Sequence, residues 1–236
     1  MRQRFASSRP TTTSTASTSA ASSRPERAGM GTIAVLASGN GSNFEAIAQA
    51  CRPGGELTGH RLGLLLCDRP EAAVVNRAVR LGVPVKLVAY KGRPRAEAEA
   101  KLQSAIDGSG ADLVVLAGFM RILGSGFVEH FRGRLVNIHP SLLPLWPGSE
   151  AIARAWQAGD SQFGVTVHFV DEGMDTGLII AQRTIPRRDS LAATEAALHA
   201  VEHELYPEVI RQLLEESGVL HSALSRQADR PNGTSP

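Results

Sequence analysis

Cysteine is scarce in this sequence: Cys51 and Cys67 are the only two, and no CxxC pair occurs. This scarcity argues against a disulfide scaffold and against a zinc ribbon, because both need several cysteines at fixed spacings. It suits a reducing cytoplasm. We expect both thiols to behave as small buried hydrophobic groups.

Long apolar runs are also missing. No stretch approaches the roughly 20 consecutive apolar residues that a membrane-spanning helix needs. The hydrophobic share is nevertheless 42% of 236 residues, enough for one large domain or two small ones. We therefore expect a folded protein with no membrane partner.

A strong net charge is absent as well, since the formal value is +2. Five arginines and one glutamate lie within residues 1–29, so that segment carries +4 and the remainder carries −2. The apparent basicity belongs to the first residues, and nothing in the remainder predicts a nucleic-acid partner.

The two ends of the chain have few bulky apolar residues. The stretch "ASSRPTTTSTASTSAASSRPERAG" cannot bury enough surface to offset its ordering entropy, which predicts a disordered extension over 1–29. Its Arg- and Ser-rich composition also describes an organelle transit peptide. The stretch "SALSRQADRPNGTSP" predicts a second disordered tail, over 221–236. The expected folded unit is 30–220.

Strand-like and helix-like stretches alternate through this unit. Five apolar runs predict strands: "TIAVLAS" (32–38), "RLGLLLCD" (61–68), "VPVKLVA", "ADLVVLAG" (111–118) and "RLVNIH". Amphipathic stretches between the first four predict helices: "FEAIAQACR", "PEAAVVNRAVRLG" and "RAEAEAKLQSAIDGSG". In the second of these, Pro70 fits a first helical turn and Gly82 follows the end.

The order of these elements predicts the fold class. The run at 111–118 is apolar on both faces, as expected for a central parallel strand covered by helices on both sides. Later, "GVTVHFVDE" and "GLIIAQRTI" predict a hairpin-like pair, and a long helix follows them with one apolar face, formed by Leu198, Val201, Leu205 and Leu213. We predict one α/β domain with a doubly wound, mostly parallel sheet, a C-terminal hairpin-like strand pair and a long closing helix. Ligands of such sheets bind beyond the carboxyl ends of the strands.

The first predicted strand leads into the glycine-rich stretch "ASGNGSNFEAI". A turn through Gly41, followed by Ser42 and Asn43 at a helix start, offers free backbone N–H groups and the positive end of a helix dipole to a phosphate. The dinucleotide fingerprint fails because Phe44 occupies its third glycine position, and the Walker A lysine is absent. A monophosphate therefore fits better than a dinucleotide. The alternative is a tight turn with an N-cap serine.

The stretch "LVNIHPSLLP" places two polar residues at the end of another strand. Asn137 and His139 point to the same side because strand residues alternate. An amide and a protonated imidazole can both donate hydrogen bonds to a developing oxyanion. The alternative is a structural histidine held by a loop carbonyl. A carboxylate that could tune the histidine lies in "HFVDEGMDTG", which offers Asp171, Glu172 and Asp175.

Two further histidine motifs carry weaker signals. "HAVEH" fits an H-x-x-E-H zinc signature with His199 and His203 one helical turn apart. A third ligand is required and no downstream motif supplies it, so we expect no metal. His168 in "VTVHFV" is expected to be a hydrogen-bonded structural residue.

Five separated motifs together resemble the glycinamide ribonucleotide formyltransferases, also called phosphoribosylglycinamide formyltransferases. They are "SGNGSN", "AGFMRIL", "NIHPSLLP", "VTVHFVDEGMDTG" and "VEHELYP". The resemblance covers about 31–218. It implies transfer of a formyl group from the co-substrate 10-formyltetrahydrofolate to the amine of glycinamide ribonucleotide, in de novo purine biosynthesis.

The resemblance also assigns roles to residues. It implies that Asn137 contacts the formyl oxygen and the folate, that His139 is the catalytic acid, and that Asp175 favours its imidazolium form. The residues implied to hold the ribonucleotide are Gly41, Ser42 and Asn43 at the phosphate and Glu202 at the ribose. The further folate-binding residues are Arg95, Met120, Arg121, Ile122 and Leu123, with the loop 170–175 around the pterin.

Other functions remain open from the sequence. Methionyl-tRNA formyltransferases and formyltetrahydrofolate hydrolases share the Asn-His-Asp constellation, although "SGNGSN" favours the ribonucleotide enzyme. A non-catalytic nucleotide-binding module would explain the glycine loop alone. Ile152 and Leu178 depart from residues common in the family and border the expected folate site, so donor affinity can differ. The sequence is compatible with a monomer or a homodimer.

Overall fold

The computed structural model describes the backbone of residues 30–228, and the side chains as far as residue 216. The extension predicted over 1–29, and residues 229–236 of the predicted tail, lie outside the described residues. The closing helix α6 (Leu191–Ala228) continues past residue 220, so the domain boundary expected there falls inside a helix. The stretch from Pro207 to Ala228 contains no further proline that would break the helix.

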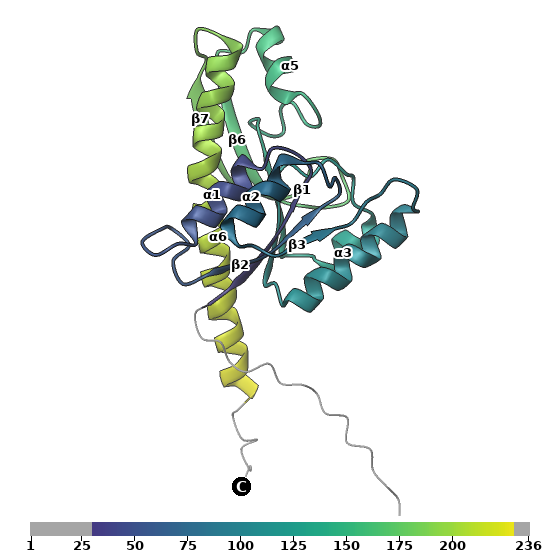
Figure 1. Cartoon of the computed structure of the whole chain (residues 1–236). Helices are drawn as coiled ribbons and strands as arrows, with labels where there is room; N and C mark the ends of the chain where they lie inside the picture. Colours follow the sequence, from purple (N-terminus) through teal and green to yellow (C-terminus); the bar gives the residue numbers. More distant parts are fainter. Residues whose placement is uncertain (1–29, 229–236) are drawn as a thin grey trace, which may run out of the picture.

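The described residues form a seven-stranded sheet in the order β3-β2-β1-β4-β5-β6-β7. The strands are β1 (Thr32–Ala37), β2 (Arg61–Cys67), β3 (Val85–Leu87), β4 (Leu113–Leu116), β5 (Leu135–His139), β6 (Gln162–Phe169) and β7 (Ile179–Pro186). The first five pair in parallel, whereas β6 pairs antiparallel with both β5 and β7. The predicted mostly parallel sheet with a hairpin-like pair after it is confirmed (Figure 1).

Helices cover both faces of the sheet. They are α1 (Ser42–Ala50), α2 (Ala73–Leu81), α3 (Arg95–Ser109), α4 (Ser125–His130), α5 (Ala151–Ala158) and α6. Alternate residues of β1 belong to two separate hydrophobic clusters: Ile33 and Val35 pack with residues of α1, α2 and α6, whereas Ala34 and Leu36 pack with residues of α3 and α4. This double burial explains why β1 has no polar face, and it confirms the doubly wound prediction.

The start of α2 and the presence of two short helices differ from the sequence-based expectations. α2 begins at Ala73 after an extended Ala72, so Pro70 precedes the helix and does not lie in its first turn. Gly82 ends this helix as expected, with a φ of 70° that favours glycine. The short helices α4 and α5 were not predicted, because six and eight residues are too few for a clear helical period.

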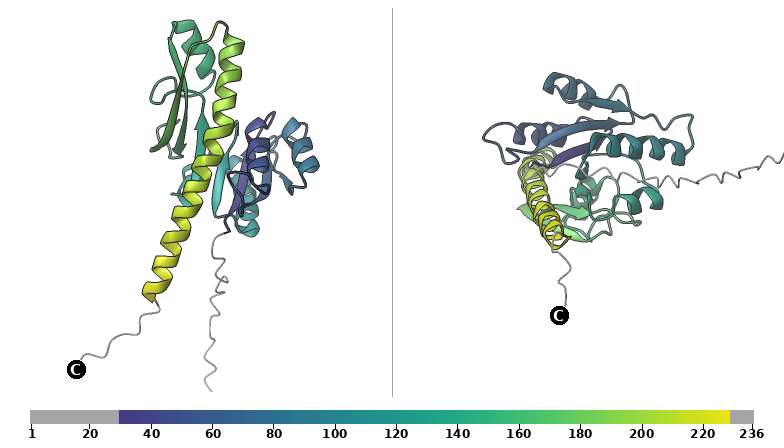
Figure 2. Two further views of the ribbon diagram at one scale, coloured as in Figure 1. Left: turned by 90° about the vertical axis from the view of Figure 1, so that its left-hand side faces the viewer. Right: turned by 90° about the horizontal axis from the view of Figure 1, so that it is seen from below.

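A single buried tyrosine fastens α6 to the middle of the sheet. The hydroxyl of Tyr206 donates to the carbonyl of Leu116 in β4 at 2.8 Å and to that of Val136 in β5 at 3.2 Å. Leu116 is the last residue of β4, whereas Val136 lies near the start of β5, directly before Asn137. α6 therefore supports β5 directly before Asn137, and Figure 2 shows the α6 backbone passing alongside the sheet. No helix among the described residues is long and apolar enough to cross a membrane.

The two tyrosines of the chain allow a matched test of this support. Tyr206→Phe should lower the free energy of unfolding by about 1 to 2 kcal/mol, because two buried carbonyls lose a hydrogen-bond donor. Tyr90 is the control, since its buried hydroxyl has no hydrogen-bond partner among the described residues. Tyr90→Phe should leave that free energy unchanged or raise it slightly. Urea unfolding followed by circular dichroism measures both, and equal losses would contradict the assignment.

Candidate active site

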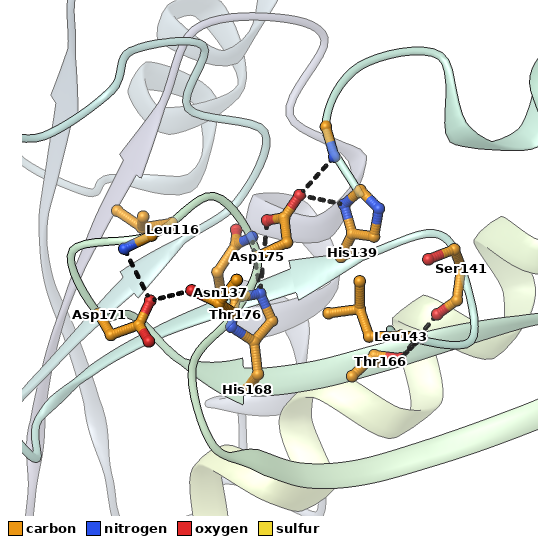
Figure 3. Close-up of polar contacts among 12 residues, drawn as sticks. Leu116, Asn137, His139, Ser141, Leu143, Thr166, His168, Asp171, Asp175 and Thr176 are labelled. Atoms are coloured by element: carbon orange, nitrogen blue, oxygen red, sulfur yellow. Dashed lines mark hydrogen bonds and ion pairs between the residues drawn. The ribbon is translucent and has the colours of Figure 1, made fainter. Parts of the chain in front are cut away.

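The predicted catalytic side chains meet at the carboxyl end of β5. Asn137 and His139 point to the same side of this strand, as expected from strand alternation. The antiparallel partner β6 places His168 opposite Asn137 and Thr166 opposite His139. The connection from β6 to β7 then brings Asp175 over both strands (Figure 3). Segments far apart in sequence therefore form one polar cluster.

Asp175 lies between two histidines. Its Oδ2 is 3.4 Å from His139 Nδ1, and its Oδ1 is 3.6 Å from His168 Nε2. Oδ2 also accepts a hydrogen bond of 2.8 Å from the N–H of Gly148. The carboxylate side chain is only 13% exposed. One buried anion thus faces two groups that can each carry a positive charge.

These neighbours lower the pKa of Asp175 from 3.8 to about 2. The contact with His168 is the largest cause, and burial acts in the opposite direction by disfavouring the charged form. The N–H of Gly148 and the charge of His139 add to the lowering. Asp175 is therefore an anion throughout the physiological pH range.

His139 has a hydrogen-bond acceptor beside each ring nitrogen. Nε2 donates to the carbonyl of Trp146 at 2.9 Å, while Nδ1 faces the carboxylate of Asp175. Both ring nitrogens therefore have an oxygen acceptor within reach. The side chain is also buried. A ligand oxygen that approaches Nε2 would replace the Trp146 carbonyl as its acceptor.

His168 joins the cluster, although the sequence predicted only a structural role. Its Nδ1 donates to the carbonyl of Phe169 at 2.8 Å, which fixes the tautomer. Its Nε2 lies 3.3 Å from the amide nitrogen of Asn137 as well as near Asp175. An unprotonated Nε2 accepts from the Asn137 amide, whereas a protonated Nε2 donates to the Asp175 carboxylate.

The loop after His139 is fastened by Thr166, which is fully buried. The Thr166 hydroxyl donates to the carbonyl of Ser141 at 2.6 Å and accepts from the N–H of Leu143 at 3.1 Å. Gln182 of β7 donates to the same hydroxyl and to the Leu143 carbonyl, each at 2.8 Å. These bonds hold the start of the loop. Further along the same loop, the carbonyl of Trp146 accepts from His139 and orients its ring.

Of the three acidic candidates in the β6–β7 connection, Asp175 is the one that reaches His139. Asp171 accepts hydrogen bonds from the N–H of Gly173 and the hydroxyl of Thr176, within the connection itself. Glu172 is exposed. The connection turns sharply at Gly177, where a Cβ would lie 1.8 Å from the Phe169 carbonyl oxygen, so no other residue fits there.

The glycine-rich loop leads into α1 with open backbone donors. Gly41 is the N-cap, with a φ of 80°, and a Cβ at this position would lie 2.4 Å from Val74 Cγ2. Gly41 is therefore required for two reasons. No side chain caps this helix, so the alternative of an N-cap serine is wrong. The first N–H groups of α1 stay available for an anion.

α6 brings Glu202 to this loop. Asn43 Nδ2 donates to Glu202 Oε2 at 2.9 Å, and His199 Nδ1 lies 3.0 Å from the same oxygen. Glu202 raises the pKa of His199, because it favours the protonated ring. The residues expected to hold a ribonucleotide thus lie together. Within the described residues, no three His, Cys, Asp or Glu side chains are arranged to hold a metal ion.

The residues expected to bind folate follow β4 at the same edge of the sheet. Met120 and Ile122 are exposed, and Leu123 packs partly against the α3–α4 side of the core. Arg121 is already paired, with its Nε 2.6 Å from Asp68 Oδ2. Arg95 begins α3 and approaches Gly124, next to this segment.

The two departures from the family pattern lie in different surroundings. Ile152 is partly buried and packs against the α1–α6 side of the core, whereas Leu178 is exposed at the end of the connection that carries Asp175.

Comparisons with known proteins agree with this geometry. A family model described as "Formyl transferase" matches residues 31–210. The phosphoribosylglycinamide formyltransferase of Bacillus subtilis is 43% identical over 189 residues, which cover 77% of this chain and 94% of that protein. The chain belongs to the formyl transferase family.

Solved structures and longer relatives support this membership. The crystal structure of glycinamide ribonucleotide transformylase 1 from Geobacillus kaustophilus matches with a TM-score of 0.75 at 47% identity, over 78% of this formyl transferase and 99% of that chain. The trifunctional purine biosynthetic protein adenosine-3 of Drosophila melanogaster is 37% identical over 83% of this chain, which spans only 15% of that protein.

The lowered pKa of Asp175 gives this formyl transferase a defined stability profile. Because the pKa falls on folding, ionised Asp175 stabilises the folded state above pH 3.8, and this contribution is lost as the pH falls through about 2. Asp175→Asn should therefore lower the free energy of unfolding at neutral pH by up to about 2 kcal/mol. Urea unfolding between pH 2 and 7 measures this. A difference that does not shrink toward pH 2 would contradict the assignment.

Proposed function

We propose that this formyl transferase moves the formyl group of 10-formyltetrahydrofolate to the amine of glycinamide ribonucleotide. The products are formylglycinamide ribonucleotide and tetrahydrofolate, in de novo purine biosynthesis. The observation that carries the proposal is the cluster of Asn137, His139 and Asp175, in a chain whose relatives are named for this reaction.

The reaction places a negative charge where this cluster can stabilise it. The amine attacks the formyl carbon, a new C–N bond forms, and the carbonyl oxygen becomes a tetrahedral oxyanion. The Asn137 amide and the protonated His139 donate to that oxygen, in a setting largely closed to water. The charge of Asp175 favours the donating form of His139, and His168 Nε2 lies beside both Asn137 and Asp175.

Collapse of the intermediate completes the transfer. The bond between the formyl carbon and the folate nitrogen breaks, and that nitrogen takes up the proton that the attacking amine releases. The proton passes either through His139 or through a water held by Asp175, and both routes use groups at the same strand end.

The remaining residues are assigned to binding. Gly41, Ser42 and Asn43 hold the phosphate through the N-terminus of α1, and Glu202 takes the ribose. The segment 120–123 and the connection 170–175 hold the folate. Both substrates are small molecules. We further infer a cytoplasmic enzyme, since Cys51 and Cys67 are unpaired, that acts as a monomer or homodimer without a metal.

An assay that omits each component in turn tests this function. Formyl transfer should require both glycinamide ribonucleotide and 10-formyltetrahydrofolate, and it should survive dialysis against a chelator. Tetrahydrofolate release, followed by absorbance, and formylated product, followed by mass spectrometry, should rise together. Release at an unchanged rate without the ribonucleotide would identify a formyltetrahydrofolate hydrolase instead.

His139→Ala tests the assigned chemistry. Loss of this oxyanion donor should lower kcat on the order of a hundredfold or more, with smaller changes in the KM of either substrate. His130→Ala is the control. His130 lies in α4, on the other face of the sheet from α1 and α6, and contacts Gln103 and Asp107 of α3. Steady-state kinetics of both variants should separate them. A His139→Ala enzyme with most of its turnover would refute the role.

A further inference from the structure

The glycine-rich loop that leads into α1 is held by an arginine from another helix. Arg77 of α2 donates from Nε to the carbonyl of Asn40 at 2.8 Å and from Nη2 to the side-chain oxygen of Asn40 at 2.9 Å. Its Nη1 pairs with Glu45 in the first turn of α1. Each nitrogen of the guanidinium therefore has a protein partner, which leaves it poorly suited to be the main ligand of a phosphate.

These contacts determine which way the backbone of the loop faces. In a trans peptide the N–H of one residue points away from the carbonyl before it. The Gly39 carbonyl accepts from the N–H of Val74 at 3.1 Å, and the Asn40 carbonyl accepts from Arg77, so both carbonyls face α2. The N–H groups of Asn40 and Gly41 must then face away from α2. Successive N–H groups on one side of a turn form an anion-binding concavity.

Arg77 also removes an electrostatic obstacle. Glu45 lies one turn from the α1 N-terminus, where its carboxylate would repel a bound phosphate. Pairing with Arg77 cancels this charge, and both side chains are largely buried, at 23% and 27% exposure. Arg80 does less, because it is 65% exposed and its Nη2 is 3.9 Å from Glu45.

We propose that Arg77 is a positioning residue for the phosphate of the ribonucleotide: it orients the loop backbone toward the phosphate and neutralises Glu45 without being the main phosphate ligand. This inference rests on the proposed function for the identity of the ligand. The orienting bonds to Asn40 need the planar fork of arginine, which binds two oxygens at once. The neutralisation needs only a positive charge.

Four variants separate these two contributions. Arg77→Ala removes both, and Arg77→Lys keeps a charge near Glu45 without the fork. Arg77→Ala combined with Glu45→Gln removes the repulsion but leaves the loop unheld. Arg80→Ala is the matched control on the same helix. Thermal unfolding of each variant checks that the fold is kept.

Two readouts report on the site. Inorganic phosphate is the first probe, with its affinity measured by titration calorimetry and its competition against the ribonucleotide measured kinetically. The KM values of ribonucleotide and folate are the second. Arg77→Ala should weaken phosphate and ribonucleotide binding on the order of tenfold, while kcat and the KM of the folate stay within about twofold.

The phosphate and ribonucleotide affinities of the other variants should fall in a defined order. Arg77→Lys and the double variant should each recover part of the lost affinity, and Arg80→Ala should match the wild type. Phosphate and ribonucleotide affinities of Arg77→Ala that equal the wild-type values would overturn the inference. So would equal losses in the KM of both substrates. Failure of the proposed function has a different signature, in which the wild-type enzyme binds phosphate with the same dependence on Arg77 but forms no formylated product.

Discussion

Strand β5 pairs in parallel with β4 on one side and antiparallel with β6 on the other, and the site depends on this change of direction. The parallel neighbour sets Asn137 level with Leu116 at the carboxyl edge. The antiparallel neighbour sets His168 directly opposite Asn137. A slip of one residue in either ladder would turn Asn137 and His139 to the other face. Two contacts hold this register. Tyr206 of α6 donates to carbonyls of β4 and β5, and Thr166 of β6 donates to the carbonyl of Ser141, just after β5.

The charges of the side chains add to the arrangement that the backbone sets. One buried carboxylate lies between two histidines and accepts a hydrogen bond from the Gly148 N–H, so its negative charge stabilises a positive charge on either ring. Two residues in this region adopt left-handed backbone conformations, Trp146 and Asp175, each with φ of 56°. Such conformations cost free energy in non-glycine residues and persist where surrounding bonds fix them. Here those bonds are the ones that orient His139.

Features that depend on a short segment could be predicted from the sequence, whereas features that depend on contacts between distant segments could not. The buried β1 and the position of Asn137 and His139 at the carboxyl end of β5 could be predicted, because alternation and strand ends are properties of short segments. The contact of His168 with the site could not, since it depends on the β5–β6 register across the long connection from 140 to 161. The start of α2 was missed for a similar reason, because Val74 in its first turn packs closely against Gly41, which is distant in sequence.

Both ends of the described chain lie away from the carboxyl edge of the sheet. β1 begins at the opposite edge of the sheet, and the last turns of α6 leave in the same direction (Figures 1 and 2). A polypeptide joined before β1 or after α6 therefore does not have to pass over the carboxyl edge of the sheet, where the candidate site lies. The domain is consequently suited to fusion with other catalytic units.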